Sequence, residues 1–143
     1  MTIARQVITI YNKCFDDASP PYPPSTTWIK TVLKNCQFED KVQRSFNGNG
    51  IITIDKSNLV IIPHVKRAKP YMQENEWEKL PNEQKAGYWT LKAGDYISLG
   101  DTPEITGEFT IIKLTTDYKA FLIKEITDLS GQPVLPHFEV QGI

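Results

Sequence analysis

The fold is decided by residues 51–62, IITIDKSNLVII, which hold two apolar runs on either side of the polar segment 55–58. Isoleucine, valine and threonine branch at the β-carbon and favour strands. Pro63 follows, and a proline cannot donate a ladder hydrogen bond. Residues 51–54 and 59–62 therefore predict two short strands.

Similar runs, separated by turn residues, recur along the chain. The clearest are residues 5–11, 28–34, 96–99, 108–114, 120–126 and 137–140. Residues 108–114 and 120–126 are expected to pair as a hairpin across the connection 116–119. About eight short strands in 143 residues predict a single, mainly β domain over residues 1–143, either a small β-barrel or a sandwich with long loops.

Two segments interrupt this strand pattern. Residues 16–26 carry four prolines and predict an extended loop. Residues 63–89 form a long insertion, in which residues 73–80 predict a short helix carrying Trp77 and Leu80 and a second turn is expected near Asn82. Long connections of this kind are often functional.

Several strands are apolar on both faces, which is unusual for a barrel that has one face in water. The examples are residues 51–54, 59–62 and 110–112. Two coverings are possible. The insertion folds back as a lid over the outer face, or another subunit covers it.

Composition narrows the class of function. The chain has 16 basic and 17 acidic residues and a net charge of −1, which disfavours general nucleic-acid binding. The basic segment with Lys66 and Arg67 could still touch a phosphate. Cys14 and Cys36 are expected to be two reduced thiols. The chain shows no signal peptide and no apolar run long enough for a membrane span, so we expect no membrane contact.

No catalytic, cofactor or metal site is expected. His64 and His137 each follow a proline near a strand end, far apart in sequence. Gly48 and Gly50 precede a strand and not the helix that a phosphate loop requires. We therefore expect no enzyme activity, no cofactor and no metal.

Aromatic side chains are the remaining candidates for a functional surface. Exposed aromatics anchor protein interfaces and also serve as platforms for glycans or single-stranded nucleic acid. The candidate interface residues are Tyr22, Lys66, Arg67, Tyr71, Trp77, Leu80 and Trp89.

Six stretches together resemble a family of small proteins from phages and prophages of Gram-positive bacteria. They are residues 8–13, 31–39, 59–63, 77–80, 91–95 and 137–140. That family in turn looks like the minor capsid, head–tail joining proteins of tailed phages.

The resemblance implies a virion protein of the neck, assembled in the cytoplasm of a bacterial host. Such a stopper-like subunit would form a cyclic ring of six or twelve copies. Its partners would be copies of itself, a portal or adaptor protein, and tail terminator or tail tube proteins, with genomic DNA in the channel touched only non-specifically. The alternative from another class is a β-barrel that binds a glycan or single-stranded nucleic acid through Trp77, Trp89 and Tyr96.

Overall fold

A computed structural model describes residues 5–15, 26–46, 48, 50, 52–129, 131 and 136–143, with backbone alone for residues 41–46 and 52–56. The described strands are β1 (Gln6–Phe15), β2 (Thr26–Phe46), β3 (Ile52–Pro63), β4 (Tyr96–Leu99), β5 (Ala120–Leu129) and β6 (His137–Gly142). The described helices are α1 (Glu74–Glu78), α2 (Asn82–Lys85) and α3 (Ile111–Asp117).

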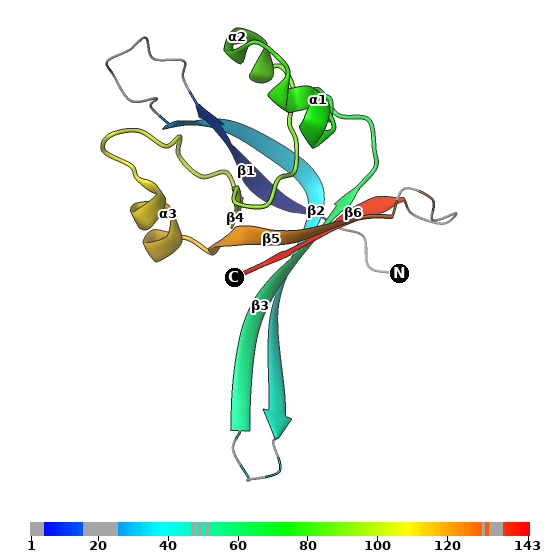
Figure 1. The fold of residues 1–143 in the computed structure, drawn as a ribbon, viewed down its shortest axis with the longest axis vertical. Coiled ribbons are helices and arrows are strands. Elements are labelled where there is room, and N and C mark those ends of the chain that lie inside the picture. Colours follow the sequence, from blue (N-terminus) through cyan, green and yellow to red (C-terminus); the bar gives the residue numbers. More distant parts are fainter. Residues whose placement is uncertain are drawn as a thin grey trace.

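The strands close into one antiparallel ring in the order β1-β2-β3-β6-β5-β4. The ring is not a regular barrel, because β2 and β3 run far beyond their neighbours as a long hairpin (Figure 1). The mainly β prediction is confirmed, and closure of the sheet favours the barrel over the sandwich.

The hydrophobic core fills the ring and draws on every strand. Ile8, Val60, Ile97, Ile123 and Val140 are fully buried members of it. β1 is buried over both faces from Ile8 to Asn12, because its outward residues are covered by the chain itself. The Tyr11 hydroxyl, for example, donates to the Pro103 carbonyl at 2.6 Å, and Thr9 Oγ1 donates to the Gly100 carbonyl at 2.6 Å.

Two strand boundaries expected from sequence are wrong. β2 is continuous through Asn35, which takes a φ of 60° and inserts one extra residue opposite β1 between the pairs Ile8–Leu33 and Gln6–Cys36. Asparagine tolerates this left-handed conformation, so the position is a β-bulge and not the start of a connection. β3 is likewise continuous, since the polar residues 55–58 all pair with β2.

The segment 108–114 was expected to be a strand, and that prediction is wrong. Thr110 is the N-cap of α3, with its Oγ1 accepting a hydrogen bond from the Lys113 amide at 3.4 Å, and Leu114 is buried below it. The expected 108–114/120–126 hairpin is therefore absent, and β5 pairs instead with β4 and β6.

The apolar faces that suggested a partner are largely accounted for within the chain. Leu59, Val60 and Ile62 are buried. Residues 110–112 belong to α3 and its cap and not to a strand, and Ile112 is 76% exposed there. The side chains of residues 51–54 lie outside the described residues. The need for a partner therefore cannot be argued from strands apolar on both faces.

Candidate interaction surfaces

The part of the β2–β3 hairpin beyond the Asp40–Asn58 pair, residues 41–46 and 52–57, projects from the body of the molecule and is called the arm (Figure 1). The last β3–β6 pair is Asn58–Gly142, and the last β1–β2 pair is Gln6–Cys36. Strands rise about 3.3 Å per residue, so the arm extends roughly 20 Å.

Both outer edges of the arm are open in the described ladders. Residues 41–46 of β2 pair with β3, and residues 52–57 of β3 pair with β2, and neither stretch has a second partner strand in the described part of the chain. A two-stranded ribbon alone is marginally stable in water, and its unpaired edges are ready to accept another strand.

The register gives the arm two different faces. Directly paired residues of an antiparallel ladder share a face, and alternate residues take opposite faces. One face holds the positions of Val42, Arg44, Phe46, Ile52, Ile54 and Lys56. The other holds the positions of Lys41, Gln43, Ser45, Thr53, Asp55 and Ser57. The arm is therefore amphipathic by sequence and register.

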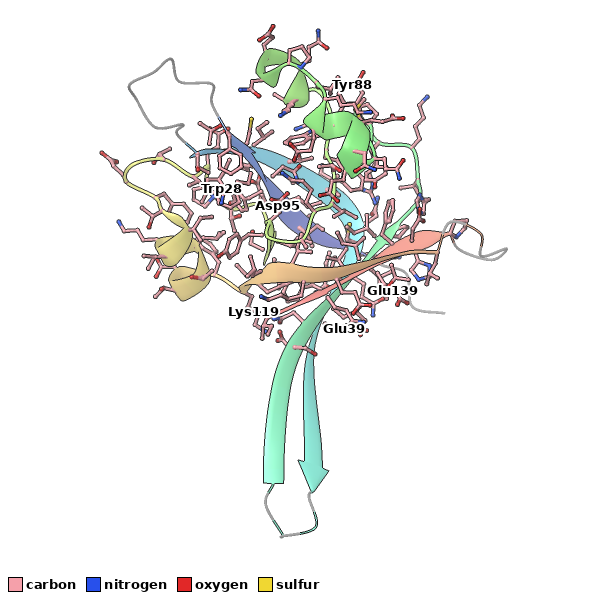
Figure 2. All side chains as sticks on the ribbon, in the orientation of Figure 1. Trp28, Glu39, Tyr88, Asp95, Lys119 and Glu139 are labelled. Atoms are coloured by element: carbon pink, nitrogen blue, oxygen red, sulfur yellow. The ribbon has the colours of Figure 1, made fainter. Side chains whose placement is uncertain are left out.

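The base of the arm is held to the body by an ion pair. Lys119 Nζ lies 2.9 Å from Asp40 Oδ2. Figure 2 shows Lys119 and Glu39 close to the point where the hairpin leaves the body of the molecule. Both side chains are more than half exposed, so the pair stabilises this contact by about 1 kcal/mol at most.

The insertion packs against its own chain around Trp77 and is called the lid. Trp77 of α1 is fully buried, and its Nε1 donates to the Lys85 carbonyl at 3.3 Å. The ammonium groups of Lys85 and Lys92 lie 4.9 and 4.6 Å from the Trp77 ring centroid, within range for cation–π attraction. Glu78 compensates both lysines, at 3.9 and 3.0 Å.

Lys92 joins this lid to β1. Its Nζ donates to the Lys13 carbonyl at 2.6 Å and lies 3.7 Å from Asp95 Oδ1. Asp95 in turn accepts hydrogen bonds from Asn12 Nδ2 at 2.9 Å and from the Lys13 amide at 3.1 Å. Asp95 lies in the middle of the body of the molecule (Figure 2) and is 2% exposed.

The Asp95 carboxyl has a strongly altered acidity. Burial raises the pKa of Asp95 to about 6, against the opposing effects of the Asn12 hydrogen bond and the Lys92 charge. Loss of water around a carboxylate disfavours its charged form, and the contacts it gains here offset that loss only in part. The charge of the Asp95 carboxyl therefore changes with pH at the contact between the lid and the sheet. This carboxyl and its hydrogen bonds are called the latch.

An aromatic cluster lies where the insertion meets the start of β6. The ring of Tyr71 is 4.9 Å from that of Trp89 and 4.7 Å from that of Phe138. A groove of about 390 Å³ beside Tyr71 is lined also by Gln73, Asn75 and Asp128 among others.

The two histidines lie at this same end of the sheet, because β3 and β6 pair Pro63 with His137. His64 Nε2 is 3.3 Å from Asp128 Oδ1, and its ring lies 4.2 Å from that of Phe138. His137 Nε2 is 3.3 Å from Glu139 Oε1. The β3–β6 and β5–β6 ladders bring Asp128 beside His64, so this contact could not be expected from sequence. Glu139 is two residues from His137 on β6, and alternate residues of a strand share a face.

The structure separates the predicted interface residues into four groups. Trp77 and Trp89 are 0% and 3% exposed and pack against their own chain, so neither side chain is accessible to a partner in this structure. Leu80 and Arg67 are half-buried, whereas Lys66 and Tyr71 are exposed. Tyr22 and the proline-rich loop, except for residue 26 at the start of β2, lie outside the described residues.

Three further findings concern the cysteines, the metal-ligating side chains and the helices of the described residues. Both cysteines are free and buried, and burial raises the pKa of Cys36 to about 11. Among the described residues there is no group of three histidine, cysteine or acidic side chains that could hold a metal ion. The described helices include none that is long and apolar enough to cross a membrane.

Comparison with known proteins gives one match. A model of a family of unknown function, DUF6751, matches residues 3–143. The chain belongs to DUF6751. No curated protein and no solved structure matches it. The closed sheet, the projecting arm and the lid are therefore features of a DUF6751 member.

Proposed function

We propose that this DUF6751 chain is a structural subunit of a phage neck, a stopper-like connector between the portal or adaptor and the tail. The observation that carries the proposal is the arm, which projects about 20 Å from a closed sheet and has open edges. Copies arranged in a ring of six or twelve would give every arm a neighbour to dock on.

The arm suits contacts of this kind for two physical reasons. A ring needs heterologous contacts, in which a projection on one copy fits a different surface on the next. Open strand edges supply main-chain hydrogen bonds, and an apolar face supplies buried area. The sequence resemblance to head–tail joining proteins supports the same reading and adds the portal, adaptor and tail proteins as partners above and below the ring.

The lid contributes to the fold in this proposal and is not the docking element that its sequence suggested. If the insertion were the docking element, deleting residues 73–80 should leave a folded monomer that fails to join heads to tails. Because Trp77 is fully buried and anchors Lys85 and Lys92, that deletion would unmake part of the fold. The arm replaces the insertion as the docking element.

Shortening the arm tests the proposal. Replacing residues 44–54 by Asn-Gly joins Gln43 to Asp55, which the register pairs, through a two-residue turn of a type that favours hairpins. The encoding phage or prophage is then induced, and its particles are counted by electron microscopy. We expect the shortened chain to fold and DNA-filled heads and tails to accumulate unjoined.

A pair of point variants controls for folding. Ile54→Asn changes the apolar face of the arm, and Thr53→Asn introduces the same side chain at the next position on the opposite face. We expect joining to fail with Ile54→Asn and to proceed with Thr53→Asn, with equal melting temperatures. Normal yields of infectious particles from the shortened arm would show that the neck function is assigned wrongly.

The ligand-binding alternative now depends on other residues than before. Trp77 and Trp89 are buried, so they offer no platform in this protomer, and the exposed aromatic at a groove is Tyr71. Titration of the tryptophan fluorescence with glycans and short single strands separates the two functions. A saturable response that Tyr71→Ala abolishes would favour the ligand-binding module.

A further inference from the structure

The chain has a second surface, a basic groove, between the outer side of β2 and the start of the insertion. One wall is residues 31–35 and the other is residues 65–69, around a volume of about 350 Å³. Four of the lining residues are basic, namely Lys34, Lys66, Arg67 and Lys69, and none of the described lining residues is acidic. This concentration of positive charge contrasts with a net charge of −1 for the chain.

Arg67 holds the two walls together. Its Nη1 donates to the Lys34 carbonyl, beside the Asn35 bulge, and its Nη2 donates to the Pro63 carbonyl at 3.2 Å. Its Nε is buried and has no hydrogen-bond partner in the described part of the chain. Carbonyl dipoles leave the charge of Arg67 uncancelled, so it adds positive potential to the floor of the groove.

Of the three lysines that line the groove, one is held by a hydrogen bond within the chain and two are exposed. Lys69 Nζ donates to Thr31 Oγ1 at 2.6 Å, and burial lowers the pKa of Lys69. Lys34 and Lys66 are exposed, one on each wall. A ligand in the groove would therefore meet two ammonium groups over a floor that already carries positive charge.

The cations of the groove act mainly through their charge. Arginine recognises carboxylates and phosphates alike through two parallel N–H groups, but both terminal nitrogens of Arg67 already donate to carbonyls of the chain, so the exposed lysines supply the attraction. Lysine binds phosphate as a point charge. The groove is also larger than one phosphate group needs, which suits a chain of phosphates.

We propose that this basic groove binds the phosphodiester backbone of nucleic acid, without reading its sequence. The inference deepens the proposed function, and it rests on that function only for the identity of the nucleic acid as the phage genome. Two lysine–phosphate contacts give weak binding that salt reverses, which is compatible with DNA that has to move past the protein.

The test measures binding of a fluorescent duplex DNA to the purified full-length chain by anisotropy, over a series of salt concentrations. Each lysine–phosphate contact contributes about 0.9 to the slope of log affinity against log salt. We expect Lys34→Gln with Lys66→Gln to reduce that slope by about 2 and to weaken binding roughly tenfold at low salt. The control, Lys113→Gln with Lys124→Gln, removes the same charge from α3 and β5 and should leave both quantities unchanged.

Competition between DNA and other polyanions identifies the chemical group that the groove binds. Inorganic polyphosphate should displace the DNA, and polyglutamate of equal charge should not. No measurable DNA binding, equal losses in the control variant, or equal displacement by polyglutamate would each overturn the inference. Because the assay needs no particle, DNA binding without head–tail joining would refute the neck function alone, and joining without binding would refute the groove alone.

Discussion

Ionisation of Asp95 should make the protein less stable as the pH rises through the acid range. The folded-state pKa is raised to about 6 from 3.8, mainly because the carboxyl is buried. An acid with a raised pKa holds its proton more tightly in the folded state than in the unfolded state. Its stabilising effect is therefore complete below about pH 4 and is lost as the pH rises through about 6.

The size of the effect follows from the shift. Each pKa unit corresponds to about 1.4 kcal/mol, so the loss approaches 3 kcal/mol between about pH 3 and pH 7. Asp95 is 2% exposed, so solvent screens this interaction little. Other carboxyl groups also titrate in this range, and a variant is needed to isolate the contribution of Asp95.

Urea unfolding at a series of pH values gives the measurement. The Asp95→Asn variant removes the titrating group, and Asp117→Asn, at an exposed position at the end of α3, serves as the control. The free energy of unfolding of the wild type, relative to that of Asp95→Asn, should fall by about 2–3 kcal/mol from about pH 4 to pH 7. The control should follow the wild type. A parallel pH dependence in Asp95→Asn and wild type would refute the latch as described.

Two further predictions concern packing. Trp77→Ala should lower the free energy of unfolding by about 3–5 kcal/mol in denaturant titrations, because a fully buried ring is lost, and a loss under 1 kcal/mol would mean that the lid is not packed as described. Gly142→Ala should cost at least about 1–3 kcal/mol, since its Cβ would stand 1.9 Å from the Leu122 carbonyl oxygen. The matched Gly107→Ala meets no atom within 4 Å and should be nearly neutral by thermal melting; equal melting temperatures for the two variants would contradict the close β5–β6 approach.

The mainly β class could be predicted because β-branched, apolar runs bounded by turn residues are encoded within a few residues. The short helices of the insertion were located by the break in this strand pattern, and neither has a side-chain cap: the N-caps of α1 and α2 are Gln73 and Pro81. α1 and α2 occupy the stretches expected, β4, β5 and β6 include the runs expected for them, and β1 includes all of its expected run except residue 5. The wrong strand boundaries are at residues whose local sequence is compatible with two different structures. Asn35 favours a turn or a bulge equally, and only pairing with β1 decides between them.

The segment 110–114 shows a second ambiguity. Thr110, Ile111 and Ile112 have high strand propensity, but Thr110 is also a good N-cap and Leu114 lies one turn later. Burial of Leu114 below α3 decides in favour of the helix, and that contact is tertiary.

The candidate surfaces were less predictable than the fold. Trp77 was expected at an interface because aromatics in long insertions often are, yet Lys85 and Lys92 enclose it within its own chain. The arm was missed because the polar residues 55–58 suggested a loop. Their place in a two-stranded ribbon follows only from the register with β2. Of the basic segment, sequence located Lys66 and Arg67, whereas Lys34 joins them through the fold.

A cryo-electron microscopy reconstruction of the particle neck tests most directly whether copies of this chain join through their arms. We expect a closed ring of six or twelve copies between portal and tail, with each arm seated on a neighbouring subunit or on the adjoining ring. A neck that lacks this chain, or arms that extend into solvent without contact, would contradict the role assigned to the arm.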